Sequence, residues 1–249
     1  MQLNSFYRIF DKTYNNSTHV YSVPNDKRFC AIQSKEIYQN LLSILNDLNA
    51  SKIVTLKQIH SNIVLNFDEI KYKYNDIKII HNKIIGDAII SSDKNIALAV
   101  KTADCVPVLL YSDYSNFIAV AHCGWRGAKH HIIRNLVSLM SKNGARNIKA
   151  IIGPAIQQYS YEVSFGYYQD FIQTSRYYKK YFVNSYCNEY YMFDLPGFVI
   201  DRLRDESVEI VEQINEDTYS MQEKYPSYRR AMHNNEEYRQ SILSIIIRK

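Results

Sequence analysis

Long apolar runs are absent from the 249-residue sequence, and nothing in it approaches the roughly 20 consecutive apolar residues that cross a membrane. Residues 1–30 also lack a basic start followed by an apolar stretch, which is the pattern of a secretory signal. We therefore expect no membrane partner and a cytoplasmic location. Glycine and proline are scarce as well, at 7 and 5 residues, and a hydrophobic fraction of 46% excludes a disordered or collagen-like chain.

Closely spaced cysteine pairs are also missing from the sequence. A chain of this length can bury a substantial core, so it does not need disulfides. The spacings are wide and irregular and contain no Cys-x-x-Cys pair, so a structural zinc finger is not expected. Any metal site must combine Cys and His residues that the fold brings together. The four cysteines are Cys30, Cys105, Cys123 and Cys187.

A strong charge of one sign is the third absence. The chain has 30 Lys and Arg against 25 Asp and Glu, and the basic residues are scattered among acidic ones rather than gathered in a run. The net charge of +5 therefore predicts no nucleic-acid partner. We expect a monomer or a weak homo-oligomer.

The hydrophobic pattern that is present changes its period along the chain. Apolar residues at spacings of three and four predict an amphipathic helix over residues 34–49. Residues 1–33 are expected to form irregular chain or short strands. Short β-branched runs predict six strands after the helix. These runs cover residues 52–56, 63–66, 84–90, 96–101, 106–111 and 117–122.

The second half of the chain returns to a helical period. Residues 124–142 predict a helix that Gly144 ends, followed directly by a strand over residues 147–152. No linker-like composition or internal repeat divides the chain, so we expect one α+β domain over residues 1–249. The remaining expected elements are helices over residues 165–181 and 196–208 and strands over residues 208–214 and 241–247.

Three residues that can bind a metal follow or precede predicted strands. His60 follows one strand, and Cys105 and His122 lie at the ends of two apolar strands that would deliver them to the same edge if those strands were neighbours. Two imidazoles and one thiolate leave the fourth tetrahedral position free, as in catalytic zinc sites. The residues alone also allow a simpler interpretation, a buried cysteine with two hydrogen-bonded histidines.

A turn with two glycines follows His122. Gly124 and Gly127 let the backbone approach a ligand, and Arg126 between them offers a planar set of donors, so the turn suits a phosphate group. The alternative is an ordinary helix entry in which Arg126 pairs with a carboxylate and Trp125 fills the core.

Several short motifs stand in the chain in a recognisable order. They are Lys57-Gln58-Ile59-His60, Gly86-Asp87-Ala88, Thr102–Val108, Ala121–Gly127, Gly153-Pro154-Ala155-Ile156, Tyr161-Glu162-Val163, Phe193-Asp194-Leu195, Ser227-Tyr228-Arg229-Arg230 and Arg239-Gln240. Together they resemble the laccase-domain family, also called the polyphenol-oxidase type, over about residues 35–249.

This resemblance implies a zinc-dependent purine nucleoside phosphorylase that cleaves adenosine or inosine with phosphate. Methylthioadenosine cleavage and adenosine deamination are related activities that it also implies. Its ligand set falls on His60, Cys105 and His122, and its fold is a layered α/β/β/α sandwich of mixed sheets flanked by helices, without a Rossmann nucleotide site. The family's older oxidase name implies copper, which is the second choice of metal here.

The N-terminal segment departs from the family. An Arg followed by a Gly-Gly-Val-Ser turn is usual there, and residues 7–23 do not contain it. We therefore treat residues 1–33 as a divergent segment in which part of the substrate pocket is missing or rebuilt. Cys123 stands where the family commonly has alanine, and we interpret it as packing because it should point away from His122.

Several residues near these motifs are candidates for roles in phosphorolysis. Asp87 or Asp104 would stabilise positive charge on the sugar, and an exposed turn position is the alternative for either. In adenosine deamination Glu162 would carry a proton, and a structural hydrogen-bonding role is its alternative. Arg126, Arg229 and Arg230 are candidates for binding phosphate, and the latter two could instead pair with acids. His130 and His131 are expected on the surface or in helix packing.

Three other functions remain open at this point. A metal-free hydrolase would use Cys105 as nucleophile with His122 or His60 as base. A copper phenol oxidase would need more ligands than one cysteine and two histidines. A zinc-binding protein without catalysis is the third, because the N-terminal segment is altered.

Overall fold

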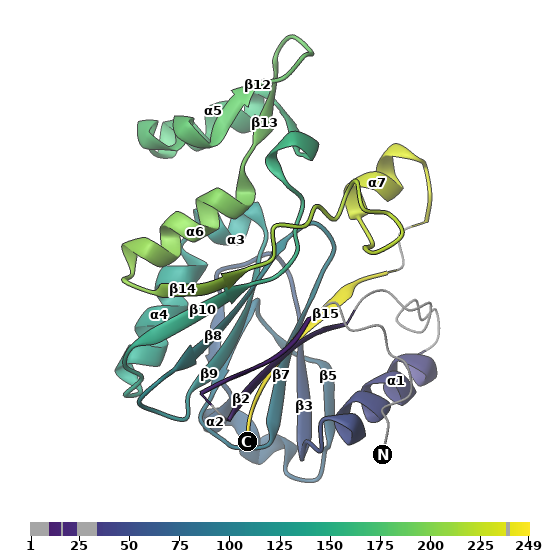
Figure 1. Ribbon diagram of the computed structural model, residues 1–249, viewed down its shortest axis with the longest axis vertical. Coiled ribbons are helices and arrows are strands. Elements are labelled where there is room, and N and C mark those ends of the chain that lie inside the picture. Colours follow the sequence, from purple (N-terminus) through teal and green to yellow (C-terminus); the bar gives the residue numbers. More distant parts are fainter. Residues whose placement is uncertain (1–9, 16, 24–33, 238–239) are drawn as a thin grey trace.

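Two six-stranded sheets packed face to face form the centre of the computed structural model, which describes residues 10–15, 17–23, 34–237 and 240–249 (Figure 1). In spatial order, the first sheet contains β1 (Phe10–Tyr14), β2 (Thr18–Val23), β15 (Ile242–Arg248), β7 (Ile96–Thr102), β3 (Lys52–Lys57) and β5 (Ile79–Ile85). The second contains β14 (Glu209–Gln213), β10 (Ile148–Ile152), β8 (Val106–Ser112), β9 (Ile118–Cys123), β6 (Ala88–Ser91) and β4 (Val64–Asn66).

Alternation of side chains along the strands explains the layers. In β7, Leu98 packs into the core between the two sheets, whereas Ala97 packs outward against α1 (Ser34–Asp47). In β9, Val120 belongs to the core between the sheets and Ala121 to the core under the helices on the other side. Because both faces of these strands are apolar, each sheet must be covered on both sides.

Helices close the sandwich on its two outer faces. The first sheet is covered by α1, and the second by α4 (Ile132–Lys142) and α6 (Leu195–Asp205), with the short α3 (Trp125–Lys129) beside them (Figure 1). Between β4 and β5 the chain forms α2 (Phe67–Ile70) and η2 (Lys71–Tyr74). Helix, sheet, sheet and helix layers confirm the expected α/β/β/α sandwich. Both sheets mix parallel and antiparallel pairs, which distinguishes them from the mostly parallel sheet of a Rossmann fold.

A third, smaller sheet extends beyond the second sheet's helices (Figure 1). Its core is aromatic, with the Phe171 ring 4.9 Å from that of Phe193 and 5.5 Å from that of Phe198. Sequence periodicity missed this sheet because its strands are only three or four residues long. The elements of this region are η3 (Gln158–Ser160), β11 (Glu162–Ser164), α5 (Phe165–Thr174), η4 (Arg176–Tyr181), β12 (Phe182–Asn184) and β13 (Tyr190–Phe193). Later in the chain, α7 (Tyr228–His233) lies between β14 and β15 in sequence.

Two predicted elements are each split in the structure. The run over residues 84–90 is not one strand, because the chain leaves the first sheet at Ile85 and enters the second at Ala88. At the crossing point a Cβ on Gly86 would lie 3.3 Å from the Ile63 carbonyl oxygen and 2.6 Å from Leu65 Cδ1, so a side chain there would force Leu65 to move. The helix over residues 124–142 is broken at His131, whose φ of 67° is left-handed and starts α4 in a new direction.

The remaining predicted elements differ mainly at their ends. The helix over residues 165–181 is correct only to Thr174, since the last six residues form a 3₁₀ helix instead. Residues 10–14 and 18–23 form a hairpin, in agreement with short strands, whereas the rest of the divergent segment lies outside the described residues, as does Cys30. Within the described ranges, every helix is too short or too polar to cross a membrane.

Candidate metal centre

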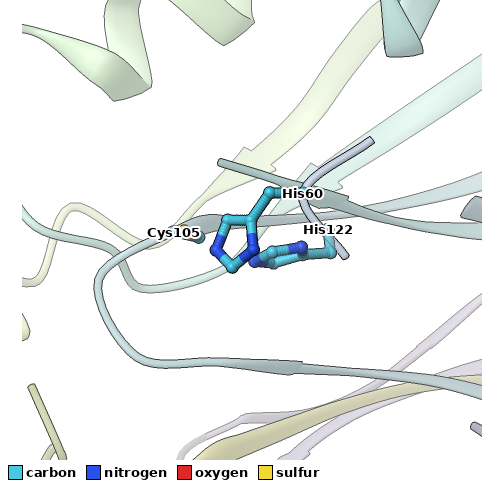
Figure 2. Close-up of side chains that lie close together, drawn as sticks. All are labelled: His60, Cys105 and His122. Atoms are coloured by element: carbon cyan, nitrogen blue, oxygen red, sulfur yellow. The ribbon is translucent and has the colours of Figure 1, made fainter. Parts of the chain in front are cut away.

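His60, Cys105 and His122 converge at one end of the sandwich, and one potential ligand atom from each lies within 4.8 Å of the other two (Figure 2). They come from the chain after β3, the turn before β8 and the end of β9. β8 and β9 pair antiparallel with Val106 opposite Cys123 and Pro107 opposite His122, which brings Cys105 next to His122. The prediction that these strands are neighbours is therefore confirmed.

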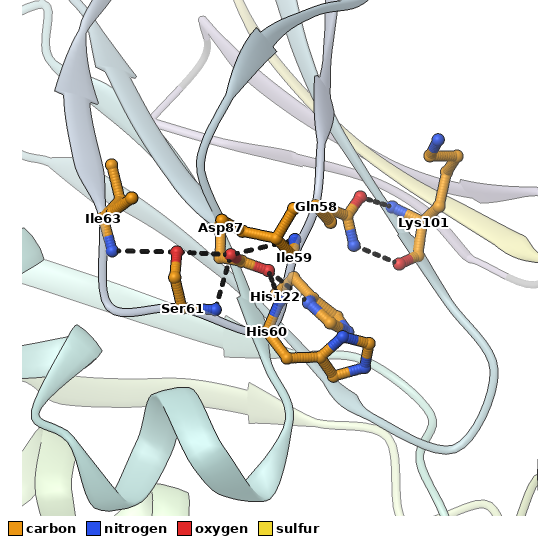
Figure 3. Close-up of polar contacts among 8 residues, drawn as sticks. All are labelled: Gln58, Ile59, His60, Ser61, Ile63, Asp87, Lys101 and His122. Carbon is orange, nitrogen blue, oxygen red and sulfur yellow. Dashed lines mark hydrogen bonds and ion pairs between the residues drawn. The ribbon is translucent and has the colours of Figure 1, made fainter.

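A buried carboxylate shapes the loop that carries His60. Asp87 is fully buried and accepts hydrogen bonds from the backbone N–H groups of Ile59, His60 and Ser61 and from the Ser61 hydroxyl, at 2.7–3.2 Å (Figure 3). These bonds hold His60 at a φ of 59°, a left-handed conformation that is uncommon without glycine. The loop is thus built around Asp87 before any ligand arrives.

The same carboxylate orients His122. Asp87 Oδ1 lies 2.8 Å from His122 Nδ1. Burial alone would raise the pKa of Asp87, but the hydrogen bonds from His122 and Ser61 outweigh it and lower the pKa to about 2. Asp87 is therefore an acceptor near neutral pH, so Nδ1 must be the donor and Nε2 is left to face the site.

The thiol and the imidazole stabilise each other's charged forms. Burial would raise the pKa of Cys105, but the charges and hydrogen bonds of His122 and His60 lower it to about 7. Burial would lower the pKa of His122, but the charge of Cys105 and the hydrogen bond to Asp87 raise it to about 9. The site therefore supplies a thiolate near neutral pH, which is the form of cysteine that binds metals.

The donor set and the spacing fit a zinc ion. A tetrahedral zinc ion with bonds of about 2.0–2.3 Å keeps its ligand atoms roughly 3.3–3.8 Å apart, so each pair of ligand atoms would have to approach by about 1.5 Å at most to complete three of its bonds. Gly124 makes room for this approach, because a Cβ there would lie 2.9 Å from His60 Cδ2 and 3.1 Å from Cys105 Sγ. Among the described residues this is the one group of three or more His, Cys, Asp or Glu side chains arranged to hold a metal.

These three side chains face a cavity of about 740 Å³, within the range of about 300–1,000 Å³ that is usual for small-molecule sites. Four cationic side chains line it, and none of them pairs with a carboxylate in the described part of the chain. They are Lys57, Lys101, Arg126 and Arg229. Trp125, Tyr161 and Tyr228 contribute aromatic wall to the same cavity.

The arginines of the sequence analysis have different surroundings. Arg126 is exposed and its guanidinium lies 5.0 Å from the centre of the Trp125 ring. Arg229 lies 5.0 Å over the Tyr161 ring and donates to the Glu162 carbonyl at 2.6 Å. Arg230 does not line the cavity, because it donates to the backbone carbonyls of residues 218, 219 and 225 and so holds the loop before α7 together.

The candidate acids are not equally placed. Asp104 lines the cavity, but its oxygens already accept from the Thr218 hydroxyl and the Arg229 backbone N–H, both at 2.7 Å. The Glu162 carboxylate accepts from the Ser185 hydroxyl and does not line the cavity. Asp87 lies behind the ligands, so the geometry favours a positioning role for it rather than contact with a sugar.

Other candidates have structural surroundings. A Cβ on Gly127 would lie 2.6 Å from the Ser61 carbonyl oxygen, so this glycine serves close packing of α3 on the His60 loop. Cys123 is fully buried in the core under the helices, where burial raises its pKa well above the usual value. His130 and His131 are exposed, as expected.

Sequence reasoning missed Lys57 and Lys101 as cavity residues, although both stand inside the motifs that carry the ligands. The signal was available, because each is a charged residue at the end of an apolar strand. Gln58 was missed as well. Its side chain bonds the backbone N–H and carbonyl of Lys101 at 2.8 and 2.7 Å and so ties the end of β3 to β7 (Figure 3).

Comparisons with solved structures agree with this fold. The chain superposes on Neisseria meningitidis protein NMB0706, described as family DUF152, with a TM-score of 0.79 at 20% identity, covering 96% of this chain and 98% of that one. A Bacillus licheniformis hypothetical protein, YfiH, gives a TM-score of 0.81 at 19% identity over 100% and 98% of the two chains. At these identities the likeness shows the fold alone.

Sequence comparisons are more specific. A Rickettsia prowazekii protein named purine nucleoside phosphorylase RP494 is 44% identical over 246 residues, which cover 98% of this chain and 96% of the relative. A Rickettsia conorii protein named purine nucleoside phosphorylase RC0672 is 42% identical over 98% and 96% of the two chains. A shorter match, 36% identical over 45% of this chain and 43% of the relative, joins it to adenosine deaminase RL5 from an unknown prokaryote.

The family model described as multi-copper polyphenol oxidoreductase laccase matches residues 8–246. This range includes both sheets, the three candidate metal-binding residues and the cavity. With the fold, the site and the relatives in agreement, the chain belongs to the laccase-like, multi-copper polyphenol oxidoreductase family.

Proposed function

We propose that this protein is a zinc-dependent purine nucleoside phosphorylase that cleaves adenosine or inosine with phosphate. The observation that carries the proposal is a His-Cys-His group opening into a 740 Å³ cavity with unpaired cations, in a chain 44% identical to a relative named purine nucleoside phosphorylase. The aromatic residues of this cavity suit a neutral nucleoside, and its cations suit an anionic co-substrate.

Zinc fits the donor set better than copper does. One thiolate and two imidazoles are borderline to soft ligands, and a multicopper centre would need further ligands beyond this group. When bound, zinc supplies a Lewis acid that can polarise a phosphoryl or sugar oxygen. Asp87 keeps His122 in the tautomer that presents Nε2, and Gly124 lets His60 and Cys105 approach each other.

Arg126 is the candidate for binding the phosphate co-substrate. It lines the cavity, is exposed, and has no carboxylate partner in the described chain, while its contact with the Trp125 ring holds the guanidinium plane. A guanidinium can bind two phosphate oxygens at once. Arg229 is half-buried in the same cavity and adds a second positive charge.

The reaction conserves atoms without a further reagent. A phosphate oxygen forms a bond to the sugar C1′ while the C1′–N bond breaks and its electron pair goes to the purine. The proton of monohydrogen phosphate ends on the released base, and the other product is ribose 1-phosphate. Arg126 would hold the attacking phosphate, and the aromatic wall of Trp125 and Tyr161 would exclude water that could compete with it. Methylthioadenosine would be cleaved in the same way.

A metal-free cysteine hydrolase is the second candidate, and a specific contact favours it. Cys105 is hydrogen-bonded to His122, which is bonded in turn to Asp87, and this resembles a nucleophile, base and orienting acid. Adenosine deamination is the side activity to be tested with it, since a relative matched over 45% of this chain is named adenosine deaminase RL5. Both alternatives have different products and different responses to metal removal.

The test is to incubate zinc-loaded protein with adenosine or inosine, with and without phosphate, and to measure free base, ribose 1-phosphate and inosine. We expect base release that requires phosphate and is lost in Cys105→Ala and His60→Ala. Cys187→Ala and His130→Ala are matched controls, because both side chains are exposed and outside the cavity.

Three other results would each indicate a different function. Inosine formed from adenosine without phosphate would show deamination. Zinc bound at one equivalent with no turnover would exclude the phosphorylase assignment and leave a zinc-binding protein. Hydrolysis that survives chelation but not Cys105→Ala would show the cysteine hydrolase.

A further inference from the structure

Two lysines on neighbouring strands, Lys57 at the end of β3 and Lys101 near the end of β7, line the cavity. β3 and β7 pair in parallel with Thr55 opposite Ala99, and two residues further on Lys57 and Lys101 point to the same face of the sheet. Gln58 bonds the Lys101 backbone and keeps the two chains together at this point. Like charges on neighbouring strands repel each other, so this arrangement has a cost in the absence of an anion.

The surroundings of these lysines do not neutralise them. Lys101 Nζ donates to Asn82 Oδ1 at 2.7 Å, and Asn82 in turn contacts His81 Nε2 at 3.0 Å. Within the described residues, no carboxylate lies within ion-pair distance of Lys57 or Lys101. Burial lowers the pKa of Lys101, which is the expected response of a partly buried cation without an opposite charge.

The charge of the cavity exceeds what one phosphate ion needs. Four cations line it, and its acid Asp104 is already bonded to Thr218 and to the Arg229 backbone. The four cations and Asp104 together give the lining a net charge of about +3, which two phosphate groups of about −1.5 each near pH 7 would balance. The co-substrate accounts for one of them.

We propose that Lys57 and Lys101 form a second anion subsite that binds the 5′-phosphate of the substrate, so that the protein takes purine nucleoside 5′-monophosphates in preference to nucleosides. The substrate would span the cavity, with its glycosidic bond at the His60, Cys105 and His122 group and its own phosphate at the lysines. Asn82 would orient Lys101 toward that phosphate.

The reaction part of this inference rests on the proposed function, whereas the binding part does not. With a monophosphate, inorganic phosphate forms the bond to C1′, the C1′–N bond breaks, and the proton of monohydrogen phosphate ends on the purine. The products are the free purine and ribose 1,5-bisphosphate. No oxidant, reductant or further group is required.

Binding is the first test. Titration calorimetry of the zinc-loaded protein should give a dissociation constant for inosine 5′-monophosphate at least tenfold below that for inosine. In Lys57→Met/Lys101→Met this preference should fall to less than threefold, and in Lys57→Arg/Lys101→Arg, which keeps both charges, most of it should return. Lys142→Met is the control, since Lys142 is an exposed lysine at the end of α4.

Titration with inorganic phosphate alone distinguishes the two sources of an anion at the lysines. Equal weakening of phosphate and of inosine 5′-monophosphate in the double Met variant would assign the lysines to the co-substrate and overturn the proposal. Equal affinity of the wild-type protein for inosine and its monophosphate would overturn it as well. Circular dichroism of each variant shows whether it folds. If the double Met variant does not fold, the comparison of the double Arg variant with the wild-type protein decides.

Turnover is the second test. Wild-type protein should release hypoxanthine from inosine 5′-monophosphate with a higher kcat/KM than from inosine, and ribose 1,5-bisphosphate should accumulate. If neither substrate is cleaved but the binding preference holds, the phosphorylase function fails and the subsite stands. If inosine is cleaved and its monophosphate is neither bound more tightly nor cleaved, the subsite fails and the phosphorylase function stands.

Discussion

The two walls of the cavity differ in how firmly their side chains are held. On the metal-binding wall, Asp87 accepts hydrogen bonds from three backbone N–H groups, a hydroxyl and an imidazole, so that its surroundings are fixed (Figure 3). On the cationic wall, Arg126 rests on one ring and Lys101 on one amide. The three candidate metal ligands are therefore organised in advance, whereas Arg126 and Lys101 keep their charge available for the anion that we propose.

Loss of a candidate metal ligand should have the largest effect on the metal-binding side of the cavity. Cys105→Ala removes one of three ligands and should weaken zinc binding by roughly 1,000-fold, because a third of an apparent zinc binding energy of about 10–16 kcal/mol is about 4 kcal/mol. Elemental analysis and competition with a chromogenic chelator measure the effect. Zinc retained at wild-type affinity would contradict the ligand assignment.

Low pH should weaken zinc binding at the same residues, because protons compete with zinc for them. Zinc binding must remove the proton of Cys105 below its pKa of about 7 and the proton of His122 below its pKa of about 9. From these two groups, affinity should fall about 100-fold per unit below pH 7 and about tenfold per unit between pH 7 and 9. Competition titrations at pH 6, 8 and 9.5 test the slopes, and an affinity independent of pH would exclude this ligand set.

Asp87→Asn should loosen the metal wall without removing a ligand. The amide offers one acceptor where the carboxylate offers two, and its NH₂ group must face backbone N–H donors, so we expect a stability loss of about 3 kcal/mol. Zinc affinity should fall about 10–100-fold, as is typical when the hydrogen-bond partner of a metal-bound histidine is lost. Thermal unfolding and zinc competition measure the two effects. Asp93→Asn, at an ion pair remote from the cavity, is the control.

Arg126→Ala should have the smallest effect and touch only the cationic wall. We expect the KM for phosphate to rise about tenfold, with a much smaller change in the KM for the nucleoside, because one charge-assisted contact contributes about 1.4 kcal/mol. Arg126→Lys should rescue only partly, since lysine keeps the charge and loses the planar pair of donors. Equal changes in both KM values would indicate a folding defect instead.

The clustering of the three candidate metal-binding residues could be predicted from sequence because they stand at the ends of apolar strands. Cys105 and His122 flank two strands whose apolar runs are easily recognised, and pairing of neighbours in sequence is common in sheets. His60 could be recognised as a histidine that follows an apolar strand, but its strand belongs to the other sheet, so strand pairing alone could not place it beside Cys105 and His122.

Other parts of the site could not be predicted, for physical reasons. The partners of Asp87 are mostly backbone N–H groups, which have no signature in the side-chain pattern. Apolar periodicity also records burial but not which sheet buries a residue, so the change of sheet at Gly86 was read as one strand. The direction of Arg230, toward carbonyl groups rather than the cavity, depends on a loop that sequence patterns do not describe.

The position of β15 has a consequence for synthesis on the ribosome. β15 pairs on one side with β2 and on the other with β7, so residues 242–248 fill a gap between strands made long before them. A nascent chain that has already produced His60, Cys105 and His122 still exposes the open edge of β7, which is a template for pairing with other chains. The hairpin of β1 and β2 has no partner in the sheet until that last strand emerges, and a chain stopped near residue 240 should therefore aggregate rather than accumulate as a folded metal-binding fragment.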